Sequence, residues 1–260
     1  MLHLRLDRPA RHNAFDEHLI AALTTSLEQA EQDPELRAVV LSGNGRSFSA
    51  GADLDWMARL AAASEADNVA DAQGLARLMR TLDQLPIPTI AAVHGAAYGG
   101  GVGLVACCDI ALASSEARFA LSEVRLGLLP AVISPYVVAA IGPRQARRWF
   151  STGQAFDAAT AQAIGLVHQV VADDQLQAAV QEQLDLLLQA APQACRGAKQ
   201  LVRQVIEADD AGALDLANAR RIAALRASSE GREGLSAFLY RSALRDDKPQ
   251  VQNTAGMSCV

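Results

Sequence analysis

The sequence predicts an α/β fold followed by an all-helical C-terminal part. Short, continuous apolar runs alternate with helical stretches over roughly the first half of the 260 residues. This alternation is typical of parallel strands covered by helices on both faces. From about Ser134 the pattern becomes almost wholly helical, without a long linker or an internal repeat. We therefore predict an α/β core at residues 1–190 and a helical region at 191–260.

The N-terminal half supplies the predicted strands and the helices between them. Leucines alternate with polar residues at 2–6, the period of a half-exposed strand. Asp16 can cap a helix that ends near Asp33. Further predicted elements follow in order: apolar strands at 38–42, 89–93 and 109–113, a helical stretch at 64–85, and a short buried helix at 102–107.

The C-terminal half indicates a series of helices. Asp173 or Asp174 can cap a helix with Leu176 and Val180 on its apolar stripe. Pro192 suits the first turn of the next helix. Two more helices are predicted around 211–227 and 230–244, before a polar tail.

Composition excludes several classes of protein. The net charge is −6, the pI is about 5.4 and basic residues form no run, which argues against a nucleic-acid surface. The first residues do not resemble a signal peptide, and no apolar run has membrane-spanning length. The cysteines lack a metal-ligand or CxxC spacing, so we expect reduced thiols in a cytoplasmic protein. They are Cys107, Cys108, Cys195 and Cys259.

The most informative motif is the glycine run at 99–101, followed by Glu123. Glycines between a strand and a helix leave backbone N–H groups bare enough to hold a developing negative charge. Glu123 could supply the matching proton transfer, because apolar neighbours would bring its pKa into a useful range. The alternative is a tight turn followed by a surface glutamate paired with Arg125. Position 103, where a second acid could sit, is glycine.

Several segments resemble the crotonase (enoyl-CoA hydratase/isomerase) superfamily in order and spacing. They are the opening motif at 6–14, a loop at 45–54, a segment at 88–95, the stretches 99–109 and 117–130, and a turn at 165–167. The resemblance implies a spiral of ββα turns with C-terminal trimerisation helices, assembled as a homotrimer or a dimer of trimers. It implies an acyl-CoA thioester substrate, with no metal or redox cofactor, no nucleic acid and no membrane.

The resemblance also assigns roles to residues of this chain. The N–H groups of Ala52 and Gly100 would form the oxyanion hole for a thioester enolate. Glu123 matches the family's catalytic glutamate. The coenzyme and acyl chain would contact a larger set: Arg11, His12, Ala14, Ala50, Asp53, Leu54, Trp56, Gly103 and Tyr136. Phe238 and Lys248 match a C-terminal region that in relatives leans over a neighbouring subunit's coenzyme. Relatives usually have a strand before Leu4, so we expect a late start or a shortened sheet edge.

Gly103 stands where hydratases with two glutamates carry their other acid. Its neighbourhood is similar to hydratases of branched glutaconyl-CoA thioesters, such as 3-methylglutaconyl-CoA or an isoprenoid glutaconyl-CoA. Glycine there would make room for a branched acyl chain, and the substrate's own carboxylate could help to hold water. The alternatives are an isomerase that shuttles a proton through Glu123, a binding protein without turnover, and a thioesterase or decarboxylase. Intact glycines and Glu123 favour an enzyme, and we predict a hydratase.

Overall fold

The structure is a computed structural model, and it describes residues 1–246. The chain divides into two compact units, Met1–Gln200 and the segment from Leu201 onward. The strands are β1 (Leu2–Leu6), β2 (Val39–Gly43), β3 (Thr89–Val93), β4 (Ala96–Tyr98), β5 (Ile110–Ser114), β6 (Arg118–Ala120), β7 (Phe156–Asp157) and β8 (Gln169–Val171). The α-helices are α1 (Glu17–Glu31), α2 (Leu54–Ala61), α3 (Glu65–Gln84), α4 (Gly100–Cys107), α5 (Ser134–Thr152), α6 (Ala158–Ala163), α7 (Leu176–Gln189), α8 (Pro192–Ile206), α9 (Ala211–Ala227) and α10 (Ser229–Asp246). Three 3₁₀ turns complete the set: η1 (Pro9–Arg11), η2 (Glu123–Leu126) and η3 (Asp173–Gln175).

The first unit is built on a five-stranded parallel sheet in the order β1-β2-β3-β5-β8. A second sheet has the order β4-β6-β7, with β4 and β6 parallel and β7 antiparallel. The predicted α/β class with parallel strands is therefore confirmed.

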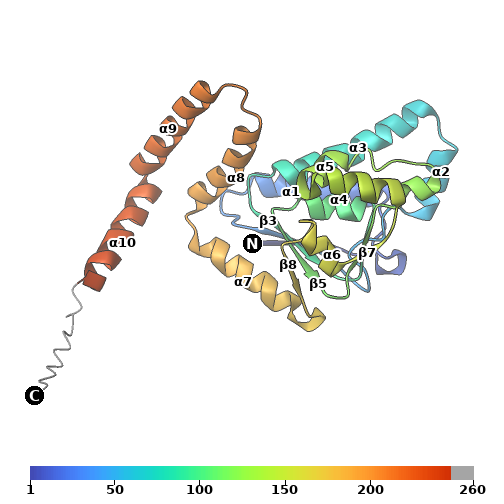
Figure 1. The fold of residues 1–260 in the computed structure, drawn as a ribbon, viewed down its shortest axis with the longest axis horizontal. Helices are drawn as coiled ribbons and strands as arrows, with labels where there is room; N and C mark the ends of the chain where they lie inside the picture. The colour runs from blue at the N-terminus through green and yellow to red at the C-terminus, as the bar shows by residue number, and fades with distance from the viewer. Residues whose placement is uncertain (247–260) are drawn as a thin grey trace, which may run out of the picture. The chain divides into compact units, whose positions relative to one another are not determined.

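Helices cover both faces of the large sheet (Figure 1). Successive side chains of a strand point to opposite faces. Val39 and Leu41 accordingly pack in the larger core with α1, α3 and α4, while Val40 and Ile90 pack in a smaller core with α7. A strand buried on both faces has no polar side, which explains the continuous apolar runs in the sequence.

The predicted helix cap Asp16 is present, and Ser64, which was not predicted as a cap, also caps its helix. Asp16 accepts a hydrogen bond from the Leu19 amide at the start of α1, and Ser64 accepts one from Asp67 at the start of α3. The prediction that Asp173 or Asp174 caps the next helix is wrong. Both residues lie in η3, and α7 begins after Gln175 without a side-chain cap.

The prediction of an almost wholly helical pattern after Ser134 is also wrong in part. Strands β7 and β8 lie in that stretch, with two and three residues. Strands β4 and β6, of three residues each, were not predicted either. Runs this short show no measurable alternation, so only their partners in the sheets define them.

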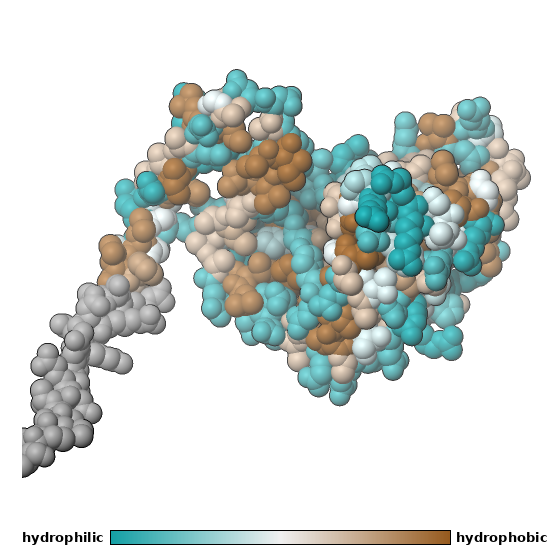
Figure 2. Space-filling model, viewed as in Figure 1, coloured by the Kyte–Doolittle hydropathy of each residue, from teal (hydrophilic) through white to brown (hydrophobic). Residues whose placement is uncertain are grey.

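The second unit consists of helices. The boundary between the units falls within α8, and the predicted boundary at residue 190 stays a prediction. Figure 2 shows apolar patches on this helical part. Large apolar side chains exposed on it are Val202, Val205, Ile206, Leu216, Ile222, Leu235, Phe238, Leu239 and Tyr240. Within residues 1–246, no helix combines the length and the apolar character needed to cross a bilayer.

The cysteines that the structure describes are free thiols. Cys107 and Cys108 are buried at the end of α4, and burial raises the pKa of Cys108 to about 12. A thiol with such a pKa stays protonated and unreactive near neutral pH. Cys259 and Lys248 lie outside the described residues.

Candidate active site

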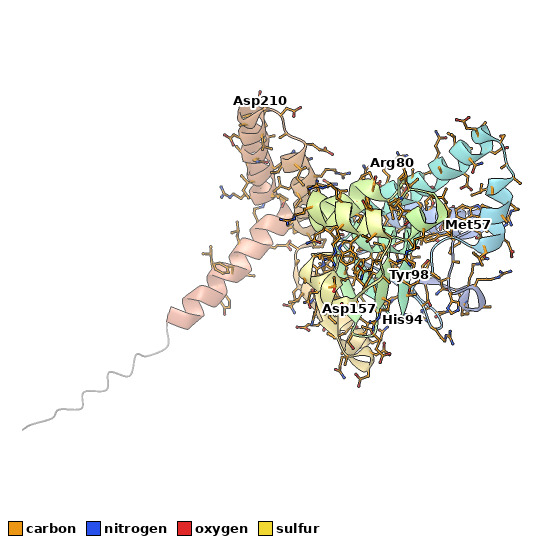
Figure 3. The ribbon with its side chains drawn as sticks, turned by 45° about the vertical axis from the view of Figure 1, so that its right-hand side comes forward. Met57, Arg80, His94, Tyr98, Asp157 and Asp210 are labelled. Atoms are coloured by element: carbon orange, nitrogen blue, oxygen red, sulfur yellow. The ribbon has the colours of Figure 1, made fainter. Side chains whose placement is uncertain are left out.

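Two loops that are far apart in the sequence run side by side at the start of α4. The Ser49 amide donates to Ala96 O, and the Tyr98 amide donates to Ser49 O, both at 2.9 Å. This parallel bridge pairs Ser49 with Ala97. The loops stay close further on: a Cβ on Gly51 would lie 3.3 Å from Tyr98 O, and one on Gly99 would lie 3.9 Å from Cα of Gly51. These glycines directly precede Ala52 and Gly100 in the sequence. Figure 3 shows Tyr98, the residue before the glycines, near the middle of the first unit.

The N–H groups of Ala52 and Gly100 are both available at this point. Phe15 donates to Gly51 O at 2.7 Å and accepts from the Asp53 amide at 2.8 Å. Because backbone groups alternate in direction along an extended segment, the Ala52 N–H points away from Phe15. Gly100 is the first residue of α4, so its N–H has no acceptor within the helix. Two backbone donors and the positive end of α4 therefore lie where the two loops run side by side, and an oxyanion hole is built from groups of this kind.

Each glycine of the run makes a different close approach. A Cβ on Gly99 would lie 3.1 Å from Oε1 of Glu123. One on Gly100 would lie 3.0 Å from the ring of Phe15, and one on Gly101 would lie 2.8 Å from Ser49 O. Gly99 also has a φ of +49°, in the region that favours glycine. The run is thus needed for packing against three separate partners as well as for turning the chain.

Glu123 lies directly against the start of α4. Glu123 is the first residue of η2. A Cβ built on Gly99 would lie 3.1 Å from Oε1 of Glu123 and 3.9 Å from Cα of Gly51, so the carboxyl lies beside both glycines. Its Oε2 is buried and has no hydrogen-bond partner among the described residues. Burial raises the pKa of the carboxyl above its ordinary value. A partly desolvated carboxyl with a free oxygen is suited to exchanging a proton with a bound molecule.

A polar cluster that the sequence did not point to holds the Ala52 loop in place. Arg8 donates to Ala14 O at 2.6 Å and to Oδ2 of Asp53 at 3.2 Å, and it pairs with Asp16 at 2.9 Å. Asn13 is fully buried and donates to the carbonyls of Asn44 and Ser47. Acceptors from two segments, residues 14–16 and Asp53, meet at one guanidinium, and sequence spacing cannot reveal such a contact.

Comparison with known proteins gives matches over almost the whole chain. The family model of enoyl-CoA hydratase/isomerase matches residues 1–245. The chain is 35% identical to the 2,3-dehydroadipyl-CoA hydratase of Escherichia coli over 250 residues, 93% of this chain and 92% of that protein. Among solved structures, an enoyl-CoA hydratase of Shewanella pealeana is 44% identical with a TM-score of 0.88, covering 92% and 90% of the two chains. AtuE of Pseudomonas aeruginosa is 36% identical with a TM-score of 0.89, covering 92% and 93%.

The chain belongs to the enoyl-CoA hydratase/isomerase family. Its fold is the crotonase fold, and it is a member of a family of enzymes that act on acyl-CoA thioesters.

The residues predicted to contact the coenzyme lie mostly around the Ala52 loop. Asp53 caps α2; burial acts to raise its pKa, but the Trp56 and Asp55 amides, Arg11 and Arg8 together lower it below its ordinary value. Arg11 pairs with Asp55 at 2.8 Å, and both are well exposed. Nδ1 of His12 lies 3.1 Å from Oγ of Ser47.

The remaining predicted contacts on this side differ in exposure. The His12 carbonyl accepts from the Ala50 amide at 2.9 Å, and Ala14 is buried. Leu54 is 76% exposed at the start of α2. Met57 lies on the same helix (Figure 3).

Two bulky residues predicted to line the acyl pocket have other partners in the folded chain. Trp56 is buried in the core, and its indole N–H donates to Asp71 of α3 at 3.0 Å. Tyr136 on α5 is half-buried, and burial raises the pKa of its hydroxyl, with smaller effects from Cys107 and Asp83. Tyr136 packs against the larger apolar core.

Gly103 does not leave open space for an acyl chain, which corrects the expectation from the sequence. A Cβ at this position would overlap Cγ2 of Ile133, and it would lie 3.0 Å from Cβ of Ile133 and 3.1 Å from Cε of Met79. Both neighbours are buried apolar side chains. The room beside Gly103 is already filled by protein.

A surface cavity of about 470 Å³ is lined by other residues. Its lining includes Arg118, Arg148, Phe156 and Asp157, of which Asp157 is labelled in Figure 3. None of the residues predicted for the active site lines it. We therefore assign the candidate active site to the start of α4, where the donors and the carboxyl converge.

Proposed function

We propose that this enzyme hydrates a 2-enoyl-CoA thioester whose acyl chain is branched and carries a carboxylate at its far end. The observation that supports it most is the position of Glu123 against Gly99, next to the Ala52 and Gly100 donors. A thioester oxygen bound to these donors brings its acyl carbons within reach of the buried carboxyl. 3-Methylglutaconyl-CoA and isoprenoid glutaconyl-CoA are the candidate substrates.

In the proposed reaction, water adds across the double bond conjugated to the thioester. The Glu123 carboxylate takes one proton from water while the oxygen bonds to the β-carbon. The electron pair of the double bond moves toward the thioester oxygen, and the Ala52 and Gly100 N–H groups stabilise the resulting enolate. Glu123 then returns the proton to the α-carbon. The sum is addition of one water, with no change of oxidation state and no cofactor.

The substrate's own carboxylate is part of this proposal. Position 103 lacks an acid, so a second protein carboxyl cannot orient water from there. A carboxylate on the acyl chain would supply that oxygen acceptor. The Escherichia coli relative is named for 2,3-dehydroadipyl-CoA, a thioester with such a group, which supports this class of substrate.

The second candidate is isomerisation of a 3-enoyl-CoA to its 2-enoyl isomer. It needs one group that removes a proton from one carbon and returns it to another, and it needs no bound water. The apolar surroundings of Gly103 favour this alternative, because Ile133 and Met79 offer no hydrogen bond to water.

The proposal includes how the enzyme is assembled and where it acts. The backbone of the Ala52 loop, with Arg11 and His12, would bind the coenzyme portion of the substrate. The exposed apolar side chains of α8, α9 and α10 would pack against further copies in a homotrimer or a dimer of trimers. We propose a cytoplasmic location, without metal, nucleic acid or membrane as partner.

The test is to incubate the enzyme separately with 3-methylglutaconyl-CoA, an isoprenoid glutaconyl-CoA and a 3-enoyl-CoA, and to measure the masses of the thioester products by mass spectrometry. A gain of one water from either glutaconyl thioester supports hydration. A product of unchanged mass with a shifted double bond, formed only from the 3-enoyl-CoA, would replace hydration by isomerisation.

Glu123→Gln should lower kcat by at least about a hundredfold, because the amide cannot transfer the proton. Glu116→Gln is the matched control, since Glu116 is exposed and lies seven residues earlier. It should turn over substrate at the wild-type rate. Near-normal turnover by Glu123→Gln would remove Glu123 from the mechanism.

A further inference from the structure

Gly103 and Ile133 are matched in size across the contact between α4 and α5. Ile133 is the residue before α5, and its side chain is 3% exposed. Cγ2 of Ile133 lies within the volume that any side chain at position 103 would need for its Cβ. Met79, from α3, closes the same space from another side.

The contact lies next to the proposed catalytic carboxyl. The Gly103 amide donates to Gly99 O at 3.2 Å, so Gly103 lies one turn along α4 from the glycine that Glu123 approaches. Glu123 approaches Gly99, and Ile133 approaches Gly103, so the carboxyl and the isoleucine meet the start of α4 at positions four residues apart. An acid at 103 would project into the volume that Ile133 fills.

We propose that Ile133 is a specificity-determining residue that excludes a second acid at position 103 and closes the acyl site with an apolar wall. The inference rests on the proposed function for its catalytic part, but the size match itself does not depend on it. The apolar wall cannot bind water. The site therefore prefers a thioester that brings its own polar group, or one that reacts without water, over a short unsubstituted 2-enoyl chain.

The test combines an acid at 103 with space to hold it. The proteins to compare are the wild type, Gly103→Glu, Ile133→Ala, the double variant Gly103→Glu/Ile133→Ala, and its isosteric control Gly103→Gln/Ile133→Ala. For each, the thermal unfolding midpoint and the hydration rate of crotonyl-CoA, a short 2-enoyl-CoA, are measured. Gly103→Glu should lower the midpoint by about 3–10 °C in the wild-type background, because overpacking strains a filled core. The same change should cost clearly less in the Ile133→Ala background.

The catalytic expectation concerns the two double variants. The glutamate variant should hydrate crotonyl-CoA at least about tenfold faster than the glutamine variant, since they differ in one acidic group. If Gly103→Glu lowered the unfolding midpoint equally in the wild-type and Ile133→Ala backgrounds, the size match between Gly103 and Ile133 would be overturned. If Gly103→Glu lowers the unfolding midpoint less in the Ile133→Ala background, but the glutamate double variant is no faster than the glutamine double variant, the assignment of this space to a second acid would be overturned.

Two further measurements keep the outcomes separate. If the Ile133→Ala variants do not fold, Gly103→Ala is compared with Gly74→Ala, whose added methyl meets nothing within 4 Å. The first should lower the midpoint and the second should not; equal midpoints would overturn the proposal. If the wild type hydrates neither glutaconyl thioester while the midpoints behave as expected, the proposed function fails and the size match stands.

Discussion

The buried carboxyl of Glu123 lowers the stability of the folded protein and at the same time suits the proposed catalytic role. Its carboxyl is partly desolvated, and Oε2 lacks a partner among the described residues. Burying a charged carboxylate without compensating hydrogen bonds is unfavourable, so the folded protein retains the proton above the ordinary glutamate pKa of 4.5. A group that must accept and return a proton benefits from this raised pKa.

This predicts how Glu123→Gln changes stability with pH. Where the folded state binds more protons than the unfolded chain, the free energy of unfolding falls as pH rises. The wild type therefore loses stability as pH rises from near 4.5 through the raised pKa of Glu123. Glu123→Gln has no such group, so its free energy of unfolding relative to wild type should increase between about pH 4 and about pH 8. Urea titrations at both pH values measure it, and an unchanged difference would contradict the raised pKa.

Gly99 should tolerate a methyl group poorly. Its φ is +49°, and the added Cβ would lie 3.1 Å from Oε1 of Glu123. Gly99→Ala should therefore lower stability by about 1–3 kcal/mol and should also reduce kcat. In contrast, Gly74→Ala in the interior of α3 meets nothing within 4 Å and should stabilise by about 0.4–1 kcal/mol. Denaturant unfolding of both variants gives the comparison, and similar free energies would contradict the strain at Gly99.

At the scale of the elements, the Ala52 loop depends on Arg8. The guanidinium joins the opening motif to Asp16 at the start of α1 and to Asp53 at the start of α2. Phe15 fixes the two residues that flank Ala52. The orientation of the Ala52 N–H is thus set in part by Arg8 and Phe15, which are not among the predicted substrate contacts.

Arg8→Met should lower kcat by up to about a hundredfold with a smaller change in KM. The reason is that a displaced Ala52 N–H stabilises the enolate less well, and this hydrogen bond matters more for the enolate than for the bound substrate. Arg8→Lys keeps the charge and should recover part of the rate. The matched control is Arg77→Met, since Arg77 pairs with Glu28 on exposed surfaces of α3 and α1. Steady-state kinetics of the three variants test this, and a loss confined to KM would contradict the positioning role.

At the scale of the whole molecule, the helical unit carries apolar side chains that remain exposed in a single chain. Phe238 is 64% exposed and Ile206 is 77% exposed. Exposed clusters of this kind mark protein contacts.

Native mass spectrometry of the full chain should therefore show a trimer or a hexamer. Phe238→Asp should shift the population toward smaller species, because a buried unpaired charge opposes association. Val69→Asp, on exposed α3 of the other unit, should leave the mass unchanged. A monomeric wild type would contradict the proposed assembly.

The sequence was sufficient for the α/β class, most long helices and the family, because these depend on local patterns. Apolar runs predict buried strands, and the motif order identified the enoyl-CoA hydratase/isomerase family. The candidate roles of Glu123, Ala52 and Gly100 also came from motifs, and the fold brings the three segments together.

Other features required the folded chain, because they depend on contacts between distant segments. Strands of two or three residues exist through their sheet partners, and the Arg8 guanidinium joins acceptors at residues 14–16 to Asp53, about forty positions later. Gly103 is the clearest case. From the sequence, the missing side chain at position 103 was expected to leave room for the substrate. In the folded chain Ile133, thirty positions later, fills that volume, because close packing leaves few voids in a protein core.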